Sequence, residues 1–269
     1  MSSSDPRNWP EYVTYGVALI LLAAALGVGY SFFVSADANS ALDARLCPKQ
    51  GAPPALLVVM VDTSDPLSIV QRKAVDNRLR EAIEQSPDHT EIQLYTVGDI
   101  TNTLLQPVAN VCNPGSGEGT SQWFSNPQLM HKRWQTRFFG PLDAKLDQML
   151  HGSATQDSPI MESIQSVAVG VFGRPELRRI ANRKLIIVSD MLQNTAGYSQ
   201  YHGDESFTRF RNSAYYFKVR PELDGVDVTI LYLRRPELRH LQGGRHVEFW
   251  RDFFTDVRAR PVEVAAVEG

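Results

Sequence analysis

A strong excess of charge of either sign is missing from this chain. Across 269 residues, 27 lysines and arginines stand against 30 aspartates and glutamates, which gives a formal net charge of −3. Such a balance provides no global attraction to nucleic acid or to an anionic membrane surface. Low-complexity tracts and solenoid repeats are also missing, and the length suits one substantial globular domain with an appendage.

The motifs of common hydrolases and redox enzymes are missing as well. The sequence has no Gly-x-Ser-x-Gly turn, no His-Glu-x-x-His helix and no Cys-x-x-Cys pair. Its six histidines are scattered, and neighbouring ones lack the spacing of metal ligands. We therefore expect a binding protein and no catalytic residue or organic cofactor.

Only two cysteines occur, Cys47 and Cys112. Both fall in expected loops, one just before the first core strand and one well beyond it. Oxidising compartments favour disulfides between such cysteines. We therefore expect a Cys47–Cys112 disulfide, with the body of the chain in a bacterial periplasm. Two unrelated free thiols in a cytosolic protein are the alternative.

One long uncharged segment runs from Tyr12 to Val34. Its length suffices to span the ~30 Å hydrocarbon core of a bilayer as a helix, and tyrosines and phenylalanines lie near its ends. We expect a transmembrane anchor at 12–34, after a cytoplasmic segment at 1–11 and before a tether at 35–54. A cleaved signal peptide ending at Val34-Ser-Ala36 is the alternative, although the leading segment lacks a basic cluster.

The most informative stretch is an aliphatic run, Ala55 to Val61, that ends abruptly in a polar segment containing Asp62 and Ser64. An uncharged run of this kind is typical of a parallel strand covered on both faces. A second copy, Lys184 to Ser189, ends in Asp190. The carboxyl ends of parallel strands meet at one edge, where such sheets bind ligands, so we expect the two aspartates to converge there.

Strands and helices alternate along the rest of the chain. We expect further strands at 90–97, 104–111 and 226–233, and helices after Pro66, at 132–150, after Ser158-Pro159, around 210–217 and at 246–257. This order predicts a three-layer α/β fold over 55–269, with an open, mostly parallel sheet and helices on both faces.

Several short motifs in this arrangement resemble a von Willebrand factor A (vWA) domain. They are the apolar strand with Asp62-Thr-Ser64, the helix-opening Ser158-Pro159, and Val188-Ser189-Asp190. The closing strand and helix, with Trp250, look similar too, and the resemblance covers Ala55 to Ala259. It implies a protein-binding module with a metal-ion-dependent adhesion site. In that family the site uses an Asp-x-Ser-x-Ser loop, a threonine from a second loop and an aspartate from a third.

The chain departs from the family pattern at two positions. Pro66 stands where the second serine belongs, and the second loop offers Ser158 or Thr155 without a clear match to the threonine. Ser68 can replace the missing hydroxyl only if the loop is displaced.

The resemblance then implies a degenerate site for Mg²⁺ or Mn²⁺ with the ligands Asp62, Ser64, Ser158 and Asp190, since a hard cation can keep water in place of missing ligands. In the other interpretation, both aspartates cap helices and accept hydrogen bonds from loop amides.

Together these features predict a membrane-tethered, extracytoplasmic vWA-like module that binds protein partners and no nucleic acid. We expect an accessory subunit of a bacterial envelope or membrane assembly, anchored in the inner membrane. Two alternatives stay open. One is a Mg²⁺-dependent phosphohydrolase of a Rossmann-like fold that uses Asp62 and Asp190, and the other is a purely structural subunit with a dead metal site.

Overall fold

The computed structural model describes residues 9–40, 42–98, 104–117, 126–152, 157–202, 206–260 and 262–269. The chain divides into two compact units, Met1–Asp43 and Ala44–Gly269.

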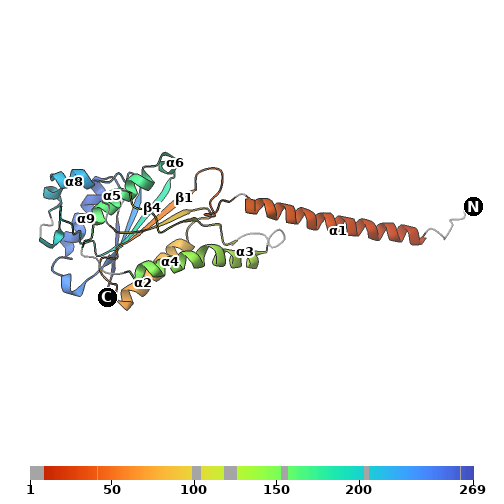
Figure 1. Cartoon of the computed structure of the whole chain (residues 1–269), viewed down its shortest axis with the longest axis horizontal. Helices are drawn as coiled ribbons and strands as arrows, with labels where there is room; N and C mark the ends of the chain where they lie inside the picture. The colour runs from red at the N-terminus through yellow and green to blue at the C-terminus, as the bar shows by residue number, and fades with distance from the viewer. Residues whose placement is uncertain are drawn as a thin grey trace, which may run out of the picture. The chain divides into compact units, whose positions relative to one another are not determined.

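The first unit contains one long helix, α1 (Trp9–Ser40) (Figure 1). This helix includes the predicted anchor at 12–34 and continues to Ser40, into the predicted tether. Leu19 and Ile20 are 67% and 70% exposed within this unit. Among the described residues, no helix combines the length and the apolar character that crossing a bilayer requires. The expected transmembrane helix is therefore not supported by the described residues.

The second unit is built on one six-stranded sheet, in the order β3-β2-β1-β4-β5-β6. All neighbouring strands are parallel except β2 and β3, which are antiparallel. The strands are β1 (Ala55–Val61), β2 (Glu91–Thr96), β3 (Ala109–Cys112), β4 (Asn182–Ser189), β5 (Asp227–Leu233) and β6 (Glu263–Val267). Every residue of the central strand β1 is buried, as its uninterrupted aliphatic run predicts.

Helices cover both faces of this sheet (Figure 1). Buried side chains of α2 (Ile69–Glu84) and α4 (Gly140–Leu150) pack on one face. The other face packs against α5 (Ile160–Val167), α8 (Ala214–Val219) and α9 (Gly244–Asp256). The predicted three-layer α/β fold with an open, mostly parallel sheet is thus confirmed.

Shorter elements complete the second unit. They are α3 (Pro127–Trp134), α6 (Pro175–Arg178), α7 (Phe207–Arg211), the π-helical turns η2 (Gln135–Phe139) and η3 (Ala168–Phe172), and the 3₁₀ turns η4 (Gln200–His202) and η5 (Pro236–Leu238). The predicted helix at 132–150 is therefore three joined segments. Its wide turn η2 lies just before Pro141, a residue that cannot donate a helical hydrogen bond.

Two strands differ from the prediction. The third strand begins at Ala109 and not near residue 104, because the N–H of Leu105 donates to the hydroxyl of Ser166 on α5 at 2.7 Å. The sixth strand, β6, was absent from the predicted order. It is short and half-exposed at the edge of the sheet, so its residues lack the continuous apolar run of β1 and β4.

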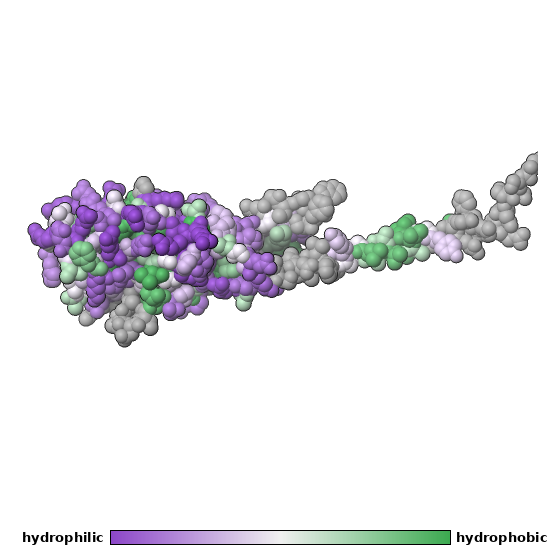
Figure 2. Space-filling view, turned by 90° about the horizontal axis from the view of Figure 1, so that it is seen from above, coloured by the Kyte–Doolittle hydropathy of each residue, from purple (hydrophilic) through white to green (hydrophobic). Residues whose placement is uncertain are grey.

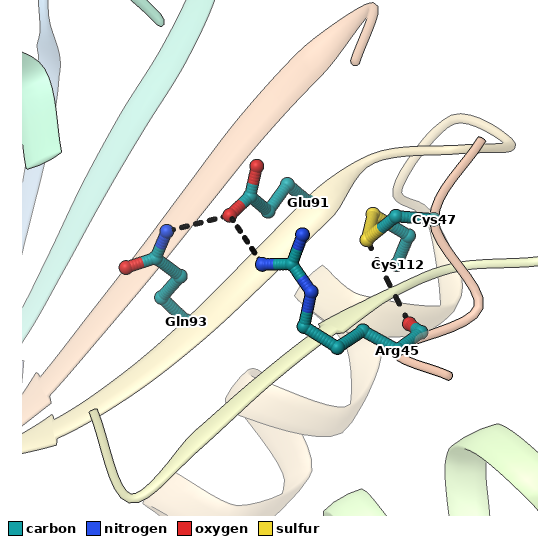
Figure 3. The surroundings of a disulfide bond; sticks show 5 residues. All are labelled: Arg45, Cys47, Glu91, Gln93 and Cys112. Carbon is teal, nitrogen blue, oxygen red and sulfur yellow. Dashed lines mark hydrogen bonds and ion pairs between the residues drawn. A yellow bond between two sulfur atoms is a disulfide. The ribbon is translucent and has the colours of Figure 1, made fainter. Parts of the chain in front are cut away.

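The predicted disulfide between Cys47 and Cys112 is present, with Cα atoms 4.8 Å apart (Figure 3). It joins the segment before β1 to the end of the edge strand β3. Beside it, the N–H of Cys112 donates to the carbonyl of Arg45 at 2.9 Å. The guanidinium of Arg45 lies 4.0 Å from the buried carboxylate of Glu91 on β2 (Figure 3). The entry segment is therefore fastened to this side of the sheet.

Candidate functional site

Asp62 directly follows β1 and is only 3% exposed. One carboxylate oxygen, Oδ2, accepts hydrogen bonds from the hydroxyls of Ser158 at 3.1 Å and Ser189 at 2.7 Å. The other, Oδ1, accepts from the backbone N–H of Ser64 at 3.0 Å. Three donors therefore compensate the buried carboxylate for the water it has lost. Among the predicted partners of Asp62, Ser64 acts here through its backbone and Ser158 through its hydroxyl.

Ser158 does not cap a helix, although the sequence predicts that role. The N-cap of α5 is Pro159, which makes no side-chain capping bond, and the N–H of Met161 donates to the Gln193 side chain instead. The backbone of Ser158 pairs with Asn194 through two hydrogen bonds of 2.9 and 3.0 Å. Its hydroxyl is thus held against Asp62. Thr155, the other candidate in this loop, lies outside the described residues.

Ser189, the last residue of β4, is a site residue that the sequence analysis missed. Its hydroxyl is fully buried, donates to Asp62, and accepts a bond from the N–H of Met191 at 2.7 Å. Met191 has φ 61°, a left-handed backbone conformation that is unusual for a residue other than glycine. The chain therefore turns sharply just after Asp190. The adjacency of Ser189 to Asp190 was the available sequence signal.

Asp190 lies on the same edge as Asp62, as predicted, and is also 3% exposed. Its Oδ1 accepts from the N–H of Leu192 at 2.9 Å. Burial, and next the charge of Asp62, raise the pKa of Asp190 to about 7, although Leu192 N–H and Arg235 act in the opposite direction. Because β1 and β4 are adjacent parallel strands, the two aspartates follow neighbouring strand ends. The interpretation that loop amides satisfy these aspartates is correct for Ser64 and Leu192.

Arg235 supplies the positive charge at this edge, a role that the sequence analysis did not assign. It follows β5, and its side chain is 9% exposed. The guanidinium Nε lies 3.5 Å from Oδ2 of Asp190. Its Nη1 donates to the carbonyl of Pro66 at 2.7 Å, and Nη2 to that of Asp65 at 3.3 Å. One side chain from the end of β5 thus joins the loop after β1 to the end of β4.

Gln242 fixes the backbone from which Arg235 extends. Its side-chain oxygen accepts from the N–H of Arg235 at 2.6 Å. Its amide nitrogen donates to the carbonyls of Asp190 at 3.1 Å and Leu233 at 2.8 Å. Because Gln242 is fully buried, this arrangement holds the ends of β4 and β5 together.

The residues at this edge do not fit a divalent cation. The hydroxyls of Ser158 and Ser189 donate to Asp62, and one oxygen of each aspartate accepts a backbone N–H. Among the described residues, no group of three or more His, Cys, Asp or Glu side chains could hold a metal ion. Ser68 forms a capping box with Gln71 at the start of α2, so it does not replace the missing serine. Metal binding by the predicted ligands stays a prediction, and the geometry offers it no support.

Buried side chains behind the site hold the loop after β4. The indole N–H of Trp250 donates to the carbonyl of Met191 at 2.9 Å. His246 lies beside it, with Nδ1 2.7 Å from the hydroxyl of Tyr232 and Nε2 3.3 Å from the side-chain oxygen of Gln200. Burial lowers the pKa of His246 to about 4, so the ring is neutral at neutral pH. His246 is therefore part of the core.

Exposed apolar side chains border this polar network. Ile69 and Val70, in the first turn of α2, are 77% and 64% exposed. Tyr201 is 41% exposed, and its pKa is raised to about 12 by partial burial and by the charges of Asp190, Asp65 and Asp62. On the face that Figure 2 shows, most of the described surface of the second unit is hydrophilic. We call Ile69, Val70 and Tyr201 the apolar rim.

Comparisons with known proteins assign no family. No family model matches the chain, and no curated protein matches it. Among solved structures, the PilB minor pilin from Streptococcus sanguinis is 12% identical over 84% of this chain and 59% of its own, with a TM-score of 0.45. The manganese-loaded TRAP protein of Plasmodium vivax is 13% identical over 81% of this chain and 71% of its own, with a TM-score of 0.35.

An aerotolerance-related membrane protein from Bacteroides fragilis NCTC 9343 is 7% identical over 66% of each chain, with a TM-score of 0.31. The present chain thus spans less than two thirds of the length of this protein and of the pilin. With TM-scores below 0.5, these similarities are too loose to give this chain a function, a ligand or a family.

Proposed function

We propose that this chain is a vWA-like module that binds a protein partner at the carboxyl edge of its sheet. The observation that carries the proposal is the apolar rim, which lies beside a buried, hydrogen-bonded polar site. The strand order, with one antiparallel edge strand, and the positions of Asp62 and Asp190 support the vWA-like assignment.

The energetics of the rim support a partner made of protein. Two neighbouring aliphatic side chains, Ile69 and Val70, are left in water by the fold itself. Burying one such side chain contributes about 1.5–3 kcal/mol. Each 1.4 kcal/mol changes an affinity about tenfold, so this pair can carry much of the specificity of an interface. The polar site beside it is already held by hydrogen bonds, so we expect it to need little rearrangement on binding.

The location that we propose is the periplasmic side of a bacterial inner membrane, where the module serves as an accessory subunit of an envelope assembly. The Cys47–Cys112 disulfide supports an oxidising compartment. The tether is proposed from the sequence, because Tyr12 to Val34 contains no charged residue. A membrane protein is then the expected kind of partner.

The two alternatives receive less support. A Mg²⁺-dependent phosphohydrolase needs a metal with an open coordination position, and the residues around Asp62 and Asp190 do not fit one. A purely structural subunit would leave the exposed rim without a role. It predicts that partner binding is indifferent to changes at Ile69 and Val70.

Capture of partners from detergent-solubilised membranes tests the proposal. The full-length chain carrying Ile69→Asp and Val70→Asp should retain less than about a tenth of the partner held by the wild type. Val169→Asp is the matched control, since Val169 is an exposed aliphatic residue of η3 and is 58% exposed. Equal capture by the rim variant and the wild type, or equal loss in the control, would contradict the proposal.

A further inference from the structure

We propose that Arg235 takes the place of the divalent cation that the vWA resemblance implies, so that this site is assembled and binds its partner without metal. The metal-free assembly rests on the geometry around Arg235, and the metal-free binding of a partner rests on the proposed function.

The guanidinium makes the connections that a metal ion would make. A cation in the implied site would join the loop after β1 to the aspartate after β4. Arg235 joins the same two segments through the carbonyls of Asp65 and Pro66 and the carboxylate of Asp190. A guanidinium is planar, always protonated and carries five N–H donors, so it can bind several oxygens at once.

Pro66, which replaces the second serine of the family's motif, is also a residue that Arg235 contacts. In the implied metal site, this position carries a serine whose hydroxyl is a ligand. Proline has no such hydroxyl, and here its carbonyl accepts the 2.7 Å hydrogen bond from Nη1 of Arg235. The position that has lost a metal ligand has thus become an acceptor for the guanidinium.

The charges of the buried aspartates also support a role for Arg235 in place of a metal ion. Asp62 and Asp190 are each 3% exposed, and Arg235 is the buried cation beside them. Two buried carboxylates repel one another unless donors or a cation offset their charge. Serine hydroxyls and backbone N–H groups serve Asp62, whereas Asp190 has one backbone donor and Arg235. Adding a divalent ion would require Arg235 to leave contacts that Gln242 helps to fix.

The first test uses the full-length wild-type chain in mild detergent, with Mg²⁺, Mn²⁺ or EDTA as the probe. We expect the thermal midpoint to change by less than about 1 °C in every case. We also expect calorimetry to show no saturable heat at millimolar metal, and EDTA to leave a captured partner bound. Saturable binding that Asp190→Asn abolishes, or release of the partner by EDTA, would overturn the inference.

The second test removes the guanidinium. At pH 9, above the pKa of about 7 at which Asp190 gains a proton, Arg235→Gln should lower the thermal midpoint by roughly 10 °C, because it leaves a buried carboxylate uncompensated. Adding Asp190→Asn to that variant should restore most of the loss. Arg260→Gln, which removes an exposed arginine paired with Asp227, should change the midpoint by less than about 2 °C.

A midpoint for Arg235→Gln within about 2 °C of the wild type would contradict the inference, as would a double variant no more stable than the single one. If Arg235→Gln does not fold, Arg235→Lys keeps the charge and loses the planar fork, and it should show a smaller fall of the same sign. The metal titration of the wild type is independent of all these variants. Unchanged partner binding in the rim variant, which would contradict the proposed function, would leave the metal-free assembly of this site untouched.

Discussion

Removing the Cys47–Cys112 disulfide should destabilise the second unit strongly. The two cysteines are separated by 65 residues, so the bond closes a long loop in the unfolded chain. Loop-closure entropy for that length gives about 4 kcal/mol of stabilisation. For a domain of this size, such a loss lowers the thermal midpoint by roughly 10 °C.

The structure indicates where the effect of reduction should appear first. The bond holds the segment around Arg45 against the edge strand β3, where the N–H of Cys112 donates to the Arg45 carbonyl. The site at Asp62 and Asp190 lies instead at the carboxyl ends of β1 and β4. Amides of β3 should therefore exchange faster after reduction, while the amides of Ser64 and Leu192 change little.

The assay is thermal unfolding followed by circular dichroism, for the wild type with and without a phosphine reductant. A chain carrying both Cys47→Ser and Cys112→Ser is the control, and it should unfold near the reduced wild type and ignore the reductant. A reduced wild type that unfolds within about 2 °C of the oxidised form would refute the reasoning.

Three further predictions address the core, the site and the topology. The fold lowers the pKa of His246 from its ordinary value of about 6.5 to about 4. As the pH falls, this histidine therefore gains its proton in the unfolded chain before it does so in the folded chain. The neutral ring therefore contributes ~3 kcal/mol to the free energy of unfolding above pH ~6.5, and this contribution is lost as the pH falls towards 4. Urea unfolding should show a smaller difference in stability between pH 7 and pH 5 for His246→Gln than for the wild type. Ser189→Ala removes a donor to Asp62 and the acceptor of the Met191 N–H, so chemical denaturation should show a loss of about 1–3 kcal/mol, and an unchanged stability would contradict the proposed network. A reporter fused after Gly269 should be active only in the periplasm, and cytoplasmic activity would reverse the proposed orientation.

The sequence was sufficient to predict the fold class and the edge at which the site lies. Aliphatic runs that end in Asp62 and Asp190 are a strong signal, because such runs are typical of strands covered on both faces. The disulfide was also predictable, since only two cysteines were available to pair. These features depend on the local order of residues, which a sequence shows directly.

The hydrogen-bond partners at the site were not predictable in the same way. Arg235 lies in Arg234-Arg235-Pro236, which looks like an ordinary solvated turn after a strand. Its burial depends on the register of β5 beside β4 and on Gln242, and neither is visible in the local pattern. Ser158 looked like a helix cap because Ser-Pro often begins a helix. Its pairing with Asn194, a long-range contact, turns the hydroxyl to Asp62 instead.

Hydrogen exchange of the full-length chain, free and in complex with its captured partner, tests the central claim most directly. If the partner binds at the carboxyl edge of the sheet, amides of residues 63–70 and 194–202 should gain protection in the complex. Amides around Val169, on η3, should exchange at the same rate in both states. Protection that appears around Val169 and not at 63–70 or 194–202 would contradict the account.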